Sequence, residues 1–272
     1  MKKRITAIIT YLLCCTGFSR PLPTGEINWS KVHILVYTRN GKGYVHENIA
    51  SASFNIIQLG KHYGFTVDTS RNAADFTESN LKKYNAIVFN NTNNDVFDTD
   101  DQRVALMRYV QAGGGFVGLH SASGTERNWA WFKRLLGASF LRHAKHQKFT
   151  EIIIDKAHPS TSFLPARWER DDECYYVKEM NPDVHVLAVH DLNSVDDKDK
   201  PTFYGDTFPS VWCHEFDGGR QWYTSLGHDS ATYTDLIFQK HLLGGIQWVI
   251  GKNKPLDFSR AHAKTPGDAL PY

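Results

Sequence analysis

The 272-residue sequence predicts an α/β fold in which a parallel sheet is flanked by helices and extended by added antiparallel strands. Two observations lead to this prediction. From residue 32 to His120, short apolar runs alternate with segments of helical periodicity, which is typical of a parallel sheet covered by helices. After residue 150, apolar and polar residues alternate within runs separated by the turn signals HPS and NPD, which is typical of antiparallel strands.

The first strand is expected at residues 32–37 and the first helix at residues 48–63. The loop between them, residues 38–47, is expected on the ligand-binding edge of the sheet because it follows the first parallel strand. His46 stands at the entrance of the helix and is therefore a candidate site residue. The alternative is that His46 only caps the helix.

Two further strands are expected at residues 65–68 and 86–90. The second of them ends in the polar run NNTNN, residues 90–94, whose amides suit hydrogen bonding to a sugar. Asn91 is the candidate from this run, and the alternative is that these amides satisfy the backbone of a turn. The order of strands and helices up to this point indicates a flavodoxin-like sheet.

A helix is expected at residues 99–112, capped by Thr99 or Asp100, and three glycines end it. The buried strand that follows, residues 116–119, ends abruptly on His120 with small residues behind it. Such a turn, at the carboxyl end of a parallel strand, is where α/β folds hold a reactive side chain up to a ligand. His120 is therefore a candidate catalytic residue.

The helix expected after His120 is rich in aromatic residues, and Trp129 is a candidate for stacking on a sugar, although core packing suits the same ring. The next segment, FLRHAKHQ, contributes His143 and Gln147 as candidate substrate contacts. His143 and His146 would share one face of a helix and could bind zinc. A helix is disfavoured because the sequence continues into a strand-like stretch, and a zinc site would need two further ligands.

The segment RDDECYY, residues 170–176, offers three acidic side chains together. Glu173 is the candidate general acid or base, because burial and the neighbouring Asp172 would raise its pKa. Tyr175 is a candidate substrate contact in the same segment. The alternative is a solvated turn whose acids pair with nearby arginines.

A strand beginning at residues 211–213 is expected to point back at the cleft and to offer Trp212 as a stacking surface. Two glycines then turn the chain so that residues 221–226 pair beside this strand and bring His228 to the same edge as His120. The two imidazoles should then lie within about ten ångströms of one another. The last helix is expected at residues 236–250.

Several segments occur in the order in which the ThuA-like family carries them, namely GGGFVGLHSAS, WAWFKRLLGASFLRHAKHQ, DDECYY and VWCHEFDGGRQWYTSLGHD. The chain resembles this trehalose-utilisation family, which is built on the class I glutamine amidotransferase scaffold. The resemblance places His120 where amidotransferases carry their nucleophilic cysteine and Ser230 where they carry the acidic partner of the base. It therefore implies that the chain is not a glutamine amidotransferase.

The resemblance also implies a role in carbohydrate catabolism, in a pathway shared with a sugar oxidoreductase that makes 3-keto sugars. We expect acid/base cleavage or hydration of an oxidised (3-keto) glycoside such as a trehalose-type disaccharide. His120, His228 and Glu173 would carry protons and His46 would hold a hydroxyl or carbonyl group. The alternatives are a non-catalytic carbohydrate-binding module and a zinc-dependent hydrolase; outside the latter no cofactor is expected.

The composition bounds the domain organisation and the partners. A net charge of +2 without blocks of like charge predicts no nucleic-acid partner, and the length favours one domain, residues 31–252, followed by a tail, residues 253–272. Residues 1–20 read as a signal peptide and residues 21–30 as a linker, so we expect an exported, periplasmic protein without a membrane span.

Cys14 and Cys15 leave lipid anchoring open as an alternative to an ordinary signal peptide, although no small residue precedes them. Cys174 and Cys213 would remain in the mature chain, and the sequence does not decide whether they pair. It also leaves open the particular sugar and the oligomeric state, for which a homodimer is one expectation.

Overall fold

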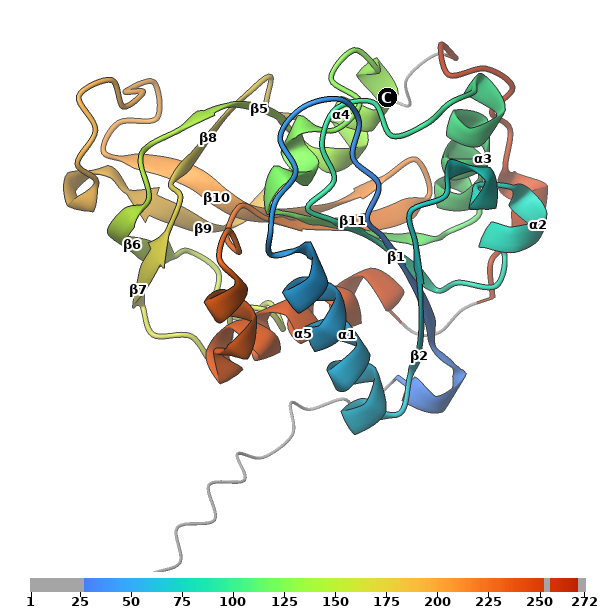
Figure 1. The fold of residues 1–272 in the computed structure, drawn as a ribbon, viewed down its shortest axis with the longest axis horizontal. Helices are drawn as coiled ribbons and strands as arrows, with labels where there is room; N and C mark the ends of the chain where they lie inside the picture. Colours follow the sequence, from blue (N-terminus) through green and yellow to red (C-terminus); the bar gives the residue numbers. More distant parts are fainter. Residues whose placement is uncertain (1–26, 252–254, 269–272) are drawn as a thin grey trace, which may run out of the picture.

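The computed structural model describes residues 27–251 and 255–268. Its strands are β1 His33–Tyr37, β2 Thr66–Ser70, β3 Ala86–Asn90, β4 Gly115–Leu119, β5 Ser139–His143, β6 Gln147–Ile153, β7 Arg167–Asp172, β8 Tyr175–Lys178, β9 His185–Asp191, β10 Thr207–Phe216 and β11 Gly219–Thr224. Nine of them form one sheet in the order β2-β1-β3-β4-β11-β10-β9-β6-β7, and β5 pairs with β8 in a separate two-stranded sheet (Figure 1).

The helices are α1 Ile49–Tyr63, α2 Glu78–Leu81, α3 Asp100–Gln111, α4 Ala130–Leu136 and α5 Leu236–Ile250. Helices α1 and α5 lie on one face of the sheet, and α3 and α4 lie on the other (Figure 1). The ends of α3 follow from its sequence: Thr99 and Gln102 form a capping box at its start, and the glycines after Ala112 end it.

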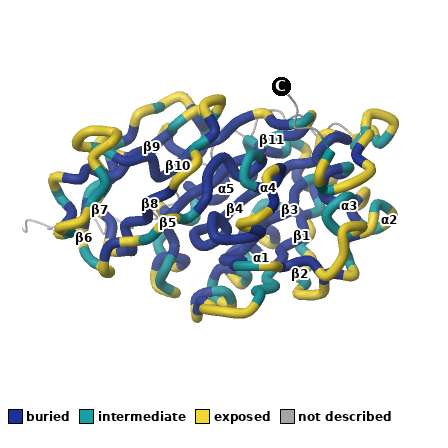
Figure 2. The backbone as a smooth tube through the Cα atoms, turned by 90° about the horizontal axis from the view of Figure 1, so that it is seen from above, coloured by how far each residue is buried: buried dark blue, intermediate teal, exposed yellow. Residues whose placement is uncertain are grey.

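The predicted α/β fold with added antiparallel strands is confirmed. Strands β2, β1, β3, β4 and β11 are parallel to one another and follow the flavodoxin strand order. Strands β10, β9, β6 and β7 extend the sheet from β11 in antiparallel fashion. Figure 2 shows the central strands β3 and β4 buried along their length, which explains their continuous apolar runs.

Two local expectations need correction. The one-turn helix α2, capped by the Thr77 side chain, stands between β2 and β3, where no helix was expected because ESNL carries no apolar periodicity. The segment FLRHAKHQ forms the end of β5, a loop and the start of β6. His143 and His146 therefore do not share the face of a helix.

Both flanks of the expected domain pack onto it where they are described. Trp29 is buried with its ring 5.3 Å from that of Phe65. In the predicted tail, Ala263 is buried and the carbonyl of Ala261 accepts a hydrogen bond of 3.1 Å from the Arg108 guanidinium. The predicted signal peptide, with Cys14 and Cys15, lies outside the described residues.

Cys174 and Cys213, both described, are buried free thiols. None of the helices in residues 27–251 and 255–268 combines the length and the hydrophobicity that a bilayer span requires.

Candidate active site

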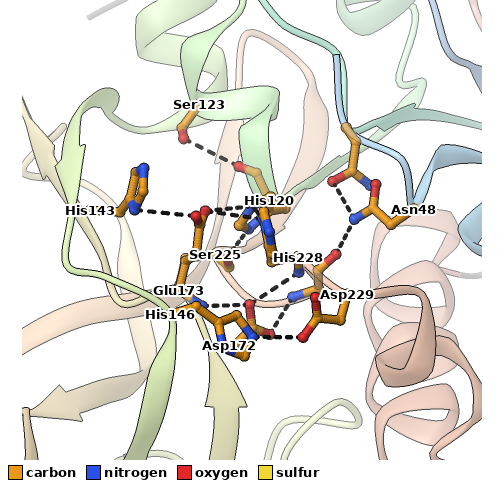
Figure 3. A network of polar contacts seen from close by, with 12 residues as sticks. Asn48, His120, Ser123, His143, His146, Asp172, Glu173, Ser225, His228 and Asp229 are labelled. Atoms are coloured by element: carbon orange, nitrogen blue, oxygen red, sulfur yellow. Dashed lines mark hydrogen bonds and ion pairs between the residues drawn. The ribbon is translucent and has the colours of Figure 1, made fainter. Parts of the chain in front are cut away.

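Four side chains converge at the edge of the sheet where the parallel strands end. His46 comes from the loop before α1, His120 follows β4, Glu173 follows β7 and His228 follows β11. One ligand-capable atom of each lies within 4.8 Å of those of the other three. We call these four residues the His–Glu cluster; Figure 3 shows three of them, His120, Glu173 and His228, at close range.

The distances within the cluster are those of direct contact. His120 Nε2 lies 3.3 Å from His228 Nδ1 and 3.5 Å from Glu173 Oε2, and His228 Nδ1 lies 3.1 Å from the same oxygen. The ring of His46 stands with its centroid 4.8 Å from that of His120 and 5.3 Å from that of His228. The expectation that the two distant imidazoles, His120 and His228, meet at one edge is therefore met.

His120 is held at the end of β4 in an unusual backbone conformation. Its φ of 48° is left-handed, which a side chain rarely adopts unless its surroundings hold it there. Its carbonyl accepts a hydrogen bond of 2.8 Å from the Tyr223 hydroxyl, and its Nδ1 lies 2.6 Å from the carbonyl of Ser225. Because a carbonyl can only accept, Nδ1 carries the proton and Nε2 presents a lone pair to the cluster.

The loop that carries His228 is fixed by its backbone. Gly227 has a φ of 111°, and a Cβ there would lie 2.6 Å from the Tyr233 hydroxyl. The buried Asp172 carboxylate accepts the backbone N–H of Gly227 at 2.8 Å and that of His228 at 3.1 Å (Figure 3). The Asn48 amide also donates to the carbonyl of Gly227. These contacts set the direction in which the imidazole points.

The pKa of Glu173 is lowered, and the expectation that it would be raised is wrong. Burial raises this pKa, but the adjacent imidazoles of His120, His228 and His143 lower it by more. Asp172 does not face the Glu173 carboxylate as a second charge, because it accepts the backbone N–H of Glu173 at 2.8 Å instead. Glu173 is therefore the negative charge of the cluster, and its hydrogen bond raises the pKa of His228.

His46 is neutral. Burial and the adjacent His120 and His228 lower its pKa to about 3. Its Nδ1 is buried and, among the residues described, has no hydrogen-bond partner. A buried polar atom left in this state costs about 1–3 kcal/mol, so a polar group held for function is expected here.

A cavity of about 460 Å³ opens over the cluster. It is lined by Tyr44, His46, Asn93, Asn94, Ser121, Gly124, Arg127, Phe140, His143, Glu173, Tyr175 and His228. His120 is fully buried behind these residues, with its ring 4.1 Å from that of Tyr175. His120 therefore supports the cavity from beneath and has no exposed surface to offer a substrate.

A larger cavity, of about 1050 Å³, lies elsewhere, beside Gly113, Gly219, Arg220 and Trp248. These residues stand at the amino-terminal ends of β4 and β11 and on α5. No predicted site residue borders it, so the chemistry is assigned to the smaller cavity above the cluster.

Five predicted site residues thus line the cavity, and His120 lies directly behind it, but the expected tryptophan platforms are absent. Trp212 is fully buried, its indole N–H donates to the carbonyl of Leu136 at 2.7 Å, and its ring lies 4.3 Å from that of Tyr223. Trp129 is buried beside Trp131 and donates to the carbonyl of Pro266 at 2.9 Å. Both rings are therefore part of the core and are not surfaces for a sugar.

Two amide candidates are also corrected. Asn91 is fully buried and donates to Asn90 Oδ1 at 2.8 Å and to the Tyr233 hydroxyl at 3.2 Å, so it organises the turn. Gln147 accepts the N–H of Asp196 at 2.7 Å and is not among the residues that line the cavity.

His143 and His146 do not form a metal-binding pair. His143 Nδ1 lies 3.3 Å from Glu173 Oε1 at the edge of the cluster. His146 Nε2 instead lies 2.6 Å from the Asp229 carboxylate. The two rings therefore have different partners, and only His143 borders the cavity.

Several lining residues were not predicted. Tyr44 lies in the loop that was expected on the binding edge, and Asn93 and Asn94 follow Asn91 in the same polar run, so a weak signal existed. Arg127 and Phe140 carry no signal in the sequence, because the packing of α4 and β5 beside the sheet is what brings them to the cavity.

Comparison with known proteins agrees with this architecture. A crystal structure of a ThuA-like protein from Bacteroides uniformis is 27% identical over 80% of this chain and 91% of that one, with a TM-score of 0.68. One from Parabacteroides merdae is 20% identical over 88% of this chain and 94% of that one, with a TM-score of 0.61, and supports the fold alone.

No curated protein matches the chain. Among protein families, the ThuA family, described as trehalose utilisation, matches residues 33–249. This match spans the sheet and contains every member of the His–Glu cluster. The chain therefore belongs to the ThuA family.

Proposed function

We propose that this chain cleaves an oxidised glycoside of the 3-keto type, such as 3-keto-trehalose, by acid/base chemistry in the cavity above the His–Glu cluster. The observation that carries the proposal is the convergence of three imidazoles and one carboxylate beside this cavity. Its volume falls within the roughly 300–1,000 Å³ of small-molecule sites. The family's description as trehalose utilisation supports a carbohydrate substrate.

The reaction requires only proton transfers. A carbonyl at C3 acidifies the proton on C2, and a base removes that proton while its bonding electrons form an enolate on the C3 oxygen. The enolate then re-forms the carbonyl, a C1–C2 double bond appears, and the bond between C1 and the aglycone oxygen breaks. The leaving oxygen takes a proton from solvent. Water added across the double bond gives the hydrated keto sugar, and no oxidant is consumed.

His143 is the proposed base. Its Nδ1 faces two acceptors, the carbonyl of Ala144 at 2.8 Å and Glu173 Oε1 at 3.3 Å. Nδ1 of the neutral ring therefore carries the hydrogen, and Nε2 is left with a lone pair. Since this side chain is 41% exposed and borders the cavity, the lone pair is accessible to a substrate.

The remaining cavity residues bind the sugar and its developing charge. His46 and His228 border the cavity beside the buried imidazole of His120 and would hold the C3 oxygen. Tyr44, Phe140 and Tyr175 offer ring faces for the C–H faces of a sugar. Asn93, Asn94 and Arg127 offer hydrogen bonds to its hydroxyls.

Release of glucose from 3-keto-trehalose tests the proposal, with unoxidised trehalose as the matched substrate. We expect turnover of the keto sugar alone, and a loss of about 100-fold or more in His143→Gln. Glu173→Gln should be similarly impaired, whereas Glu169→Gln, at an exposed position on the preceding strand β7, should keep the wild-type rate. If wild-type protein releases no more glucose than these folded variants, the enzymatic proposal fails.

A non-catalytic carbohydrate-binding module is the alternative outcome of the same experiment. Calorimetry would then show binding of the keto sugar without turnover. We also propose an exported, periplasmic location for this chain. A sugar oxidoreductase would act before it, because a 3-keto substrate must be made by oxidation. A zinc-dependent hydrolase is the second candidate, and the donor set of the His–Glu cluster favours it.

A further inference from the structure

We infer that the His–Glu cluster is a binding site for one divalent first-row transition-metal ion, with zinc the best-matched probe. The donor set is three imidazole nitrogens from His46, His120 and His228 and one carboxylate oxygen from Glu173. Imidazole with a carboxylate suits zinc and its neighbours in the periodic table, whereas magnesium and calcium prefer sites made of oxygen alone.

The spacing of the donor atoms matches a single ion. Ligands at about 2.0–2.2 Å from a tetrahedral zinc ion lie roughly 3.3–3.6 Å from one another. The three resolved separations among His120 Nε2, His228 Nδ1 and Glu173 Oε2 are 3.3, 3.5 and 3.1 Å. Three atoms from three distant segments of the chain are thus placed as they would be around one cation.

Hydrogen bonding within the cluster does not satisfy these atoms. His120 Nε2 presents a lone pair, because Nδ1 donates to the carbonyl of Ser225, and it faces the Glu173 carboxylate, which also only accepts. His228 Nδ1 has a single hydrogen, which it can donate to His120 Nε2 or to Glu173 Oε2 but not fully to both. His46 Nδ1 has no partner at all among the described residues. Converging lone pairs of this kind are stabilised by a cation.

Neighbouring groups hold the four donor side chains in place, as the hydrogen-bond partners of ligands do in known metal sites. The hydrogen bond from His120 Nδ1 to a backbone carbonyl fixes the tautomer and the orientation of the ring. Asp172 fixes the backbone at both His228 and Glu173, and His143 lies against the second oxygen of Glu173. The ligand set is therefore positioned before any ion binds, which reduces the free-energy cost of binding.

This inference rests on the proposed function only for the ion's role. The cavity borders His46, Glu173 and His228, so an ion held by the four donors would take a substrate oxygen from the cavity as a fifth ligand. That oxygen would be the C3 carbonyl, and the ion would supply positive charge to stabilise the enolate oxygen. His143 stands outside the ligand set and remains free to act as the base.

Zinc titration of the purified chain, after treatment with a chelator and dialysis, tests the inference without any substrate. We expect about one zinc per chain by elemental analysis and a zinc-dependent rise in melting temperature. Glu173→Gln and His228→Asn should weaken zinc binding about 100-fold or more. Their matched controls, Glu169→Gln on β7 and the exposed His185→Asn, should bind zinc as wild type does.

Each outcome decides a separate point. A folded wild-type chain that takes up no zinc overturns the inference and leaves a protonated imidazole as the cation of the cluster. Zinc that binds equally well to the ligand variants overturns it too, because the ion then sits elsewhere. Zinc bound at this site without turnover of keto sugars supports the inference and refutes the proposed function. Turnover in zinc-free protein supports the proposed function and refutes the ion's role in the reaction, while zinc uptake still decides whether the site exists.

Discussion

Asp172→Asn should destabilise the chain although it changes a single atom. The Asp172 carboxylate is fully buried and accepts three backbone N–H groups, from Glu173 at 2.8 Å, Gly227 at 2.8 Å and His228 at 3.1 Å. Oδ1 receives two of them and Oδ2 the third. The least costly asparagine keeps the oxygen at Oδ1 and turns its NH₂ group towards the N–H of Gly227, so that two donors face one another.

The magnitude follows from this arrangement. A hydrogen bond to a charged group contributes about 1.5–3 kcal/mol, and a buried N–H without an acceptor costs about 1–3 kcal/mol. Removing a buried charge also removes its desolvation penalty, which offsets part of the loss in unfolding free energy. We therefore expect the free energy of unfolding to fall by about 2–3 kcal/mol in Asp172→Asn, and by more in Asp172→Ala, which loses all three acceptor contacts.

Urea denaturation followed by circular dichroism measures the effect, with Asp171→Asn as the control. Asp171 is the exposed neighbour whose contact with His146, at 3.5 Å, lies at the surface, so its loss should change stability by less than about 1 kcal/mol. Zinc affinity of the folded Asp172→Asn variant should fall by about 10–100-fold. If Asp172→Asn is as stable as Asp171→Asn, the carboxylate does not hold the His228 loop and the reasoning is wrong.

Three further predictions concern stability. Gly227→Ala should destabilise the chain by clearly more than Gly205→Ala. Both positions have positive φ, but only at Gly227 would the new Cβ meet another residue. Equal effects in melting experiments would exclude the steric explanation. Trp212→Ala should cost about 3–5 kcal/mol of unfolding free energy because the ring is core, and a variant of unchanged stability with impaired sugar binding would restore the stacking role. Burial lowers the pKa of His241 from 6.5 to about 4. Between these pH values the unfolded chain binds a proton that the folded chain does not, so the free energy of unfolding falls by up to about 3 kcal/mol as the pH drops from 6.5 to 4. His241→Gln lacks this loss, and a wild-type-to-variant difference that is independent of pH contradicts the argument.

The sequence by itself determined the elements and the edge at which the site lies. Strand β3 and helix α5 have the predicted bounds, because both are specified by residues close in the chain: a short apolar run for the strand and a helical repeat for the helix. His120 was identifiable because it follows glycines and a buried strand. His228 was identifiable because a glycine turn pairs residues 221–226 with the preceding strand and brings the chain to the edge at which His120 lies.

Only the tertiary structure decided which side chains meet. The sequence placed His120 and His228 at one edge, but it did not predict their direct contact at 3.3 Å across 108 positions. Nor did it predict that Asp172 accepts the backbone N–H of His228, 56 positions away. Such contacts depend on the register and order of strands in the sheet, which the periodicity of a single sequence does not encode. The same reason explains an error: Trp212 was expected to face the cleft because its strand points back at it, but the indole packs in the core and donates to the carbonyl of Leu136 at the end of α4.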